Sequence, residues 1–300
     1  MFLTRRHFLL LSAATATSAI VGCGKSAAAE PQLVSLFSSN RVIAAGIPQR
    51  LPFGVVNNGL ELPDSTALSV RVLSEAVVID ELEVLGRVVR HDHTPGADDH
   101  QHADLQRYYA VRTTLPEPGI YDLEIRIGDH TVMLPVQAFD RSEIGIPLPG
   151  DAFPPIDTPT LDDARGVDPI CTLAGGPCAF HHQTAAQIMA EGRPLVFLVA
   201  TPAFCATAYC GPVLETLIEG ILELGSGTDL GVVHVEPWAN PRVGQGLNDP
   251  GLRLAPSLDL LGLEFEPVMF LVDPTGVIVD RIDNVFDRSE LEDALGRLLG

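Results

Sequence analysis

Apolar and polar residues alternate with a period of two over much of residues 32–140. The clearest runs are Leu68 to Val72 and Tyr121 to Ile127, and turn-forming groups such as Pro116 to Gly119 separate such runs. In each run, one set of side chains suits a core and the other suits water. Short alternating strands without a long helix predict an all-β, immunoglobulin-like sandwich over residues 32–140.

The pattern changes twice after this region. Six prolines between Ile146 and Cys171 predict an extended, stiff linker over residues 141–169. Beyond it, continuous apolar runs typical of buried strands alternate with helical stripes, and Thr184 to Gln187 fits a capping box. The predicted elements are a helix from 184 to 190, strands at 195–200, 231–236, 268–272 and 277–282, a helix after Cys210, a short helix at 254–261 and a last helix capped by Asp287. This order predicts an α/β arrangement for residues 170–300.

The first 22 residues have the pattern of an export signal peptide. Arg5 and Arg6 precede an apolar stretch, Phe8 to Val21, that is too short for a good membrane span. The pair resembles the twin-arginine signal, which directs folded proteins out of the cytoplasm. The alternative is an ordinary secretion signal in which the two arginines have no special role.

The end of this stretch, Ile20 to Cys23, resembles the lipobox of bacterial lipoproteins. The resemblance implies that Cys23 is lipidated and becomes the new N-terminus, with membrane lipid as a partner. The residues after Cys23 lack any apolar period, so we expect residues 23–31 to form a flexible tether. We therefore expect an extracytoplasmic protein, lipid-anchored to the cell membrane.

Composition narrows the possible partners. The chain has 300 residues, of which 46% are hydrophobic, and this is enough for two packed domains. Its formal net charge of -20 argues against nucleic acid as a partner, because binding a polyanion requires basic patches.

Setting Cys23 aside leaves four cysteines in an oxidising compartment, and local pairing is the simplest of three possible arrangements. Cys205 and Cys210 lie between a predicted strand and its helix, and Gly211 and Pro212 place Cys210 at that helix's N-terminus. A helix N-terminus stabilises a thiolate, so a redox-active pair is favoured over a structural disulfide or a metal site.

These features together resemble the thioredoxin fold. The cysteine pair follows the first buried strand, Pro267 directly precedes the strand at 268–272, and Gly150 to Pro155 resembles the opening motif of membrane-anchored thioredoxin-like proteins. The resemblance implies thiol–disulfide exchange on protein substrates by Cys205, Cys210 and Pro267, with no required cofactor. Thioredoxins have two residues between their cysteines, whereas this chain has four. By position we assign Cys205 as the attacking thiol and Cys210 as the resolving thiol, with the reverse assignment open.

Two other functions are compatible with the same residues. Copper-assembly proteins of the Sco type use a Cys-x-x-x-Cys-Pro pair with a histidine before the strand that here begins at Val268, where this chain has Phe265, Glu266 and Pro267. Copper delivery is therefore an alternative, as is a non-catalytic binding module whose disulfides are structural.

Two further groups of residues contain cysteine and histidine. Cys171 and Cys178 close a Gly-Pro loop that we interpret as a structural disulfide, with a second redox pair as the alternative. We interpret His181 and His182 as surface residues and His234 as a core histidine. A loop of the sandwich region contains four histidines that predict either a Cu or Zn site or a merely polar hairpin: His91, His93, His100 and His102.

Overall fold

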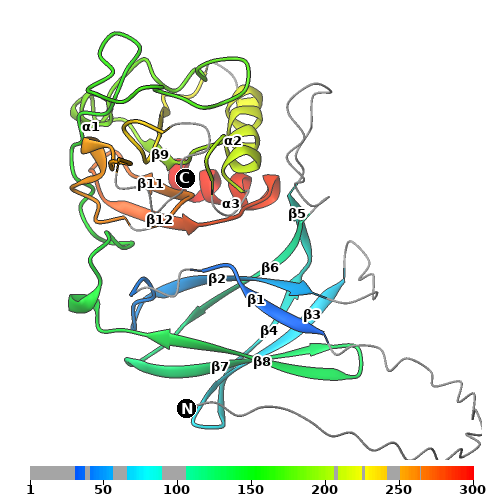
Figure 1. Cartoon of the computed structure of the whole chain (residues 1–300). Coiled ribbons are helices and arrows are strands. Elements are labelled where there is room, and N and C mark those ends of the chain that lie inside the picture. The colour runs from blue at the N-terminus through cyan, green and yellow to red at the C-terminus, as the bar shows by residue number, and fades with distance from the viewer. Residues whose placement is uncertain are drawn as a thin grey trace, which may run out of the picture.

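The computed structural model of the chain describes residues 31–37, 41–56, 66–89, 106–205, 209–224, 227–241, 251–263 and 265–300. Within these ranges the chain forms three four-stranded β-sheets and three α-helices (Figure 1). Cys23 and the histidines at 91, 93, 100 and 102 lie outside the described residues.

Two antiparallel sheets make up the N-terminal half. One has the order β1-β2-β6-β5 and the other β4-β3-β7-β8. Their strands are β1 (Gln32–Ser35), β2 (Pro48–Val56), β3 (Ala67–Ser74), β4 (Val77–Leu85), β5 (Arg87–Val89), β6 (Gln106–Thr114), β7 (Gly119–Ile127) and β8 (His130–Ala138). Alternate residues such as Val70 and Val72 on β3, and Leu123 and Ile125 on β7, are buried, as the period of two requires.

The third sheet belongs to the C-terminal half and has the order β10-β9-β11-β12. Only β9 and β10 are parallel. The elements are α1 (Ala185–Ala190), β9 (Leu195–Val199), α2 (Cys210–Leu224), β10 (Gly231–Val235), β11 (Val268–Val272), β12 (Ile278–Asp283) and α3 (Arg288–Leu299). All five residues of β9 and of β11 are buried.

The predicted fold class, a sandwich followed by an α/β thioredoxin-like fold, is wrong. The described residues are mostly β, in three small sheets, and have only three α-helices, of which α1 is six residues long. The helix expected over residues 254–261 is instead a single 3₁₀ turn, Pro256–Leu258. Pro256 starts this segment and Gly262, with a φ of 57°, ends it, so too few residues remain for a stable α-helix.

The proline-rich segment after β8 packs against the third sheet. Gly150 donates its N–H to the Ile278 carbonyl at 2.8 Å, and Ala152 forms a β-bridge with Val277. The ring of Phe153 lies 5.0 Å from that of Phe197 and 5.4 Å from that of Phe270. The segment is therefore held along the sheet at several points.

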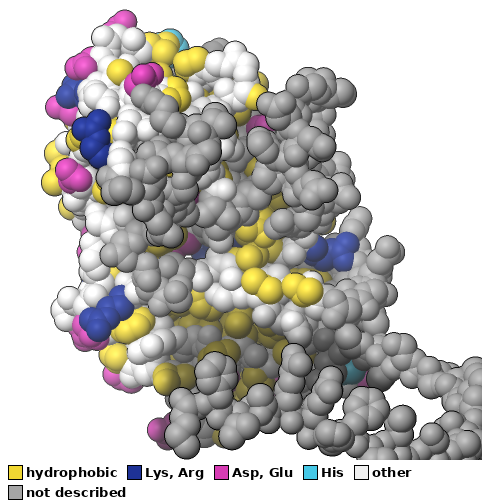
Figure 2. Space-filling model, viewed as in Figure 1, with side chains coloured by type: hydrophobic (Ala, Val, Ile, Leu, Met, Phe, Trp, Pro, Cys, Tyr) yellow, Lys and Arg dark blue, Asp and Glu magenta, His cyan; other side chains and the backbone are white. Residues whose placement is uncertain are grey.

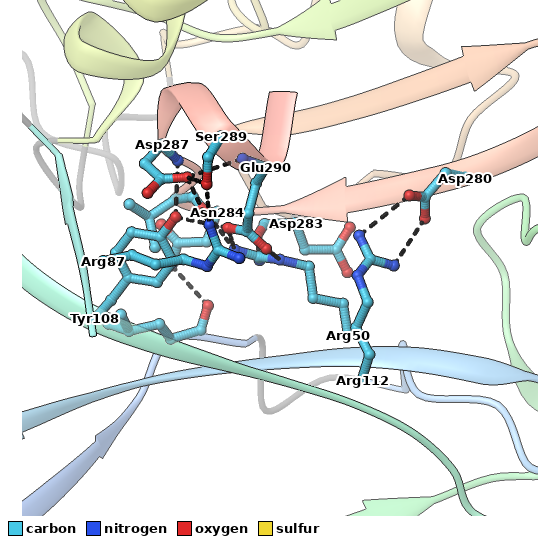
Figure 3. Close-up of polar contacts among 12 residues, drawn as sticks. Arg50, Arg87, Tyr108, Arg112, Asp280, Asp283, Asn284, Asp287, Ser289 and Glu290 are labelled. Carbon is cyan, nitrogen blue, oxygen red and sulfur yellow. Dashed lines mark hydrogen bonds and ion pairs between the residues drawn. The ribbon is translucent and has the colours of Figure 1, made fainter. Parts of the chain in front are cut away.

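A buried polar network joins the two halves (Figure 3). Arg50 on β2 donates two hydrogen bonds to Glu290 on α3, at 2.9 and 2.7 Å, and a third to the Asp283 carbonyl at 3.0 Å. The Tyr108 hydroxyl donates to Glu290 at 2.6 Å and accepts the Asp287 N–H at 2.7 Å. Both side chains of the Arg50–Glu290 pair are at most 5% exposed.

Two less buried ion pairs flank this network. Arg87 lies 3.0 Å from Asp287, and Arg112 lies 3.1 Å from Asp280. Burial by itself raises the pKa of Glu290, but the charge and hydrogen bonds of Arg50 outweigh it and hold that pKa below its usual range. Glu290 is thus an ionised partner in a buried pair.

The surface is mixed in character. On the face seen in Figure 2, hydrophobic side chains gather over the part built from β1 to β8, while acidic and basic side chains are scattered. Exposed apolar residues of this part include Val34, Val56 and Ile120. Within the described residues, no helix has the length and apolar character needed to cross a membrane.

Candidate functional site

Cys205 and Cys210 meet at the start of α2, which begins at Cys210. The backbone N–H of Cys210 donates to the Cys205 Sγ at 3.3 Å. Pro212, in the first turn, lacks an N–H, but an N–H in this turn would have no partner within the helix. The Cys205 sulfur thus receives a donor from a helix N-terminus, where negative charge is favoured.

The two thiols differ in exposure. Cys205 is partly exposed, whereas Cys210 is completely buried in the core beside Val213 and Leu214. Burial raises the pKa of the Cys210 thiol well above its usual value, and the neighbouring Cys205 raises it further. Cys210 is therefore a protonated, shielded thiol behind an accessible sulfur.

Glu266 is the third member of this group. One of its carboxylate oxygens lies within 4.8 Å of both sulfurs. Pro267, the next residue, is buried, follows a cis peptide bond and directly precedes β11. The structure therefore brings the segment before β11 next to the cysteine pair.

A second group lies in the interior and consists of Cys171, Cys178, His181 and His234. Their Sγ, Nδ1 or Nε2 atoms all lie within 4.8 Å of one another, so the described residues include a Cys/His group that could hold a metal ion. His181 and His234 have no exposed surface. The prediction that His181 lies at the surface was wrong, because the loop after Cys178 turns its side chain inward; His182 is the exposed neighbour. His234 is a core residue, as predicted.

Local backbone contacts hold this group in place. Gly175 and Gly176 have φ values of 92° and 116°, which side chains with a Cβ rarely adopt, and they turn the loop that returns Cys178 toward Cys171. The His181 carbonyl accepts the Leu161 N–H at 2.9 Å, and the Phe180 carbonyl accepts the His234 N–H at 3.3 Å. The loop is thus tied both to the proline-rich segment and to β10.

Hydrogen bonding orients the His234 ring. Its Nε2 lies 2.9 Å from the Ala200 carbonyl, which can only accept, so Nε2 is protonated. Its Nδ1 faces the two sulfurs, at 3.7 Å from Cys171 and 3.6 Å from Cys178. The same Nδ1 lies 3.3 Å from the Nε2 of His181. Four potential ligand atoms therefore converge.

Glu236 is hydrogen-bonded to the residue that follows Cys171. It lies at the end of β10, is fully buried, and accepts the Thr172 N–H at 2.6 Å. The Thr172 hydroxyl in turn accepts the Ala203 N–H at 3.1 Å. Burial raises the pKa of Glu236, although His234 and the hydrogen bond from Thr172 oppose that shift. One hydrogen bond, from Ala203 to Thr172, therefore links the residue after Cys171 to the segment before Cys205.

The structure joins none of the four described cysteines in a disulfide. The two disulfides inferred from the sequence, 171 to 178 and 205 to 210, stay predictions. The structure groups each pair as the sequence suggested, but the convergence of His181 and His234 on Cys171 and Cys178 was missed. The spacing Cys-x6-Cys-x2-His was a usable signal for three of these residues, whereas His234 lies 53 residues further on, in a strand.

Comparison with known proteins does not assign the chain to a family. No protein-family model matches it, and no curated protein matches it. Among solved structures, the crystal structure of Salmonella alpha-2-macroglobulin reacted with methylamine is similar with a TM-score of 0.27 and 11% identity over 87% of this chain. This chain spans 15% of the length of that protein. Likeness at this level supports no statement about function.

Proposed function

We propose that the chain is a thiol–disulfide oxidoreductase in which Cys205 attacks and Cys210 resolves. The observation that carries the proposal is the asymmetry of the pair. Cys205 is reachable from solvent and accepts an N–H at a helix N-terminus, whereas Cys210 is buried behind it. An accessible sulfur with a thiolate-stabilising donor has the character of an attacking thiol.

The reaction has two steps. The Cys205 thiolate attacks one sulfur of a substrate disulfide, the substrate S–S bond breaks, and the released substrate thiolate takes up a proton. Cys210 then loses its proton and attacks the Cys205 sulfur, which releases the second substrate thiol and forms the 205–210 disulfide. Two electrons pass from the chain to the substrate, and the reverse sequence oxidises a substrate dithiol.

Glu266 is the proposed acceptor of the Cys210 proton. Its carboxylate oxygen lies within 4.8 Å of both sulfurs, whereas the buried Cys210 thiol does not ionise readily by itself. A carboxylate within reach lets the resolving step proceed without moving Cys210 into water.

Trapping of mixed disulfides tests the proposal. Cys210→Ser is expected to accumulate a covalent adduct through Cys205 when reduced protein meets a disulfide-containing protein, because the resolving thiol is absent. Cys205→Ser is the matched control and is expected to trap nothing. Trapping by Cys205→Ser alone reverses the two roles. If neither variant forms an adduct and the 205–210 bridge has a potential below about −300 mV, the pair is a structural disulfide.

Copper delivery is the second candidate, favoured by the convergence of Cys205, Cys210 and Glu266. Thiolates are preferred ligands of Cu(I). Stoichiometric binding of Cu(I) by the reduced pair, together with an absence of thiol exchange, would replace the first candidate by this one.

Two proposals concern residues outside the described part of the chain. Export and lipidation at Cys23 would place the protein outside the cytoplasm on the membrane, where protein thiols and disulfides are its substrates; Cys23→Ser should then move the protein out of the detergent phase. Binding of Cu or Zn by the histidine loop should appear in calorimetric titration of the full chain. It should decrease by one site when the four loop histidines are replaced together: His91, His93, His100 and His102.

A further inference from the structure

The buried Cys/His group has the dimensions of a single tetrahedral metal centre. With Zn–S bonds of about 2.3 Å and Zn–N bonds of about 2.0–2.1 Å, a tetrahedron places sulfur and nitrogen about 3.6 Å apart and two nitrogens about 3.3 Å apart. The Nδ1 of His234 lies 3.7 and 3.6 Å from the two sulfurs and 3.3 Å from the Nε2 of His181. Three edges of the tetrahedron are thus already at metal-binding length.

The ring orientation of His234 also suits a ligand. Its Nε2 donates to the Ala200 carbonyl at 2.9 Å, so Nδ1 is the nitrogen with a free lone pair in the neutral ring, and Nδ1 faces both sulfurs. This is the arrangement in which a backbone carbonyl fixes the tautomer of a metal-binding histidine. Among the described residues, the Nδ1 of His181 has no hydrogen-bond partner, so the contact of its Nε2 with His234 and the surrounding packing orient that ring.

The group is closed to solvent. The four residues are at most 7% exposed, and all four corners of the tetrahedron come from the chain itself. A site of this kind leaves no position for water or substrate, which is the property of structural rather than catalytic zinc sites. The set of two sulfurs and two nitrogens is one that zinc prefers.

We propose that Cys171, Cys178, His181 and His234 bind one zinc ion in a closed structural centre. Binding replaces the protons of the two thiols, which leave to solvent, and forms two Zn–S and two Zn–N bonds. Two thiolates and two neutral imidazoles then balance the charge of Zn²⁺. The ion would join the 171–181 loop to β10, and through Ala200 to the segment that leads to Cys205.

A Cys171–Cys178 disulfide is the competing state. It would place the sulfurs about 2.05 Å apart and remove both thiolates, leaving the two imidazoles facing each other without an ion. The two states are mutually exclusive, so one measurement on the protein as isolated separates them.

The test uses the full chain purified without chelator. Metal analysis should find one zinc per chain at this centre. This zinc should remain when His91, His93, His100 and His102 are replaced together, so it is not an ion held by the histidine loop. Replacement by Co(II) should give the absorption of a tetrahedral site with sulfur-to-metal charge transfer. His234→Ala and His181→Ala should lose this ion, whereas His182→Ala, the exposed neighbour, should keep it. Cys205→Ser and Cys210→Ser should also keep it, so loss of exchange activity is not confused with loss of metal.

Counting the reactive thiols of the wild-type chain tests the proposal even if the histidine variants do not fold. In the wild-type chain with its metal, Cys171 and Cys178 should resist alkylation, and chelation should make both reactive, with readdition of zinc restoring protection. Peptide mapping that finds a 171–178 disulfide in the isolated protein overturns the proposal. Free thiols that neither hold zinc nor give the cobalt spectrum overturn it equally.

Discussion

At the scale of single residues, Cys205 and Cys210 are separated by only four positions but lie in opposite surroundings. One sulfur meets solvent and an N–H donor, and the other meets the apolar core. The sequence predicted a helix start at Cys210 from Gly211 and Pro212, and this start is confirmed. Which cysteine is buried depends on how the segment before the helix turns, and no local pattern encodes that turn.

This difference predicts unequal labelling. In the reduced native protein, iodoacetamide should modify Cys205 at least tenfold faster than Cys210, because Cys210 is buried and its pKa is raised. Mass spectrometry of timed samples measures both rates. In denaturant the two rates should converge, which is the internal control. Equal rates in the native state would contradict the proposed roles.

The burial of His181 was not predictable from the sequence. Neighbouring His181 and His182 have the same chemistry, yet one is completely buried and the other is exposed. A loop has no fixed period, so sequence spacing does not say which of two adjacent side chains faces the core. Helices and strands do have such a period, and there the burial was predictable.

At the scale of elements, most helices and strands of the C-terminal half were predictable from the sequence. The strand at Val268–Val272 is confirmed, as are the capping box at Thr184 and the cap at Asp287. Each cap depends on contacts within a few residues, whereas the strand pairs with distant β9 and was predictable from its continuous apolar run. The fold class was wrong because it depends on how many elements form and how they assemble, and a helical period at 254–261 did not produce an α-helix.

The link between the two cysteine groups gives a prediction at this scale. Thr172→Val removes the acceptor of the Ala203 N–H but leaves the Thr172 N–H on Glu236. Hydrogen exchange at the Ala203 N–H should become several-fold faster, because the segment before Cys205 loses this hydrogen bond. The rate of alkylation of Cys205 should change for the same reason. Thr275→Val, in the turn before β12, is a control of the same chemistry. Unchanged exchange at Ala203 would contradict the link.

At the scale of the whole molecule, Arg50 and Glu290 join residues 240 positions apart. Arg50→Ala leaves the Glu290 carboxylate buried with only Tyr108 as a side-chain donor, so the free energy of unfolding should fall by about 3–5 kcal/mol. Urea unfolding measures the loss. Arg41→Ala removes an exposed ion pair with Glu143 and should cost less than about 1 kcal/mol. A similar small cost for Arg50→Ala would show that the halves do not depend on this pair.

The same pair predicts how stability responds to acid. The pKa of Glu290 is lower in the folded chain than in the unfolded chain, so its contribution is complete above the unfolded pKa and is lost as the pH falls through the folded one. Unfolding free energies measured from pH 7 downward should fall less steeply for Glu290→Gln than for the wild type. Parallel slopes would contradict this contribution.

The packing of the proline-rich segment has a consequence for how the chain can be divided. Residues 161–166 are exposed and include Arg165, a site for trypsin, while residues 150–153 before them are paired with the third sheet. A cut at Arg165 would therefore yield an N-terminal fragment that retains both Arg50 and the bridge at Ala152, and a C-terminal fragment that retains Glu290 and Val277. The two fragments would remain a noncovalent complex, and the protein is suited to reconstitution from two separately produced pieces.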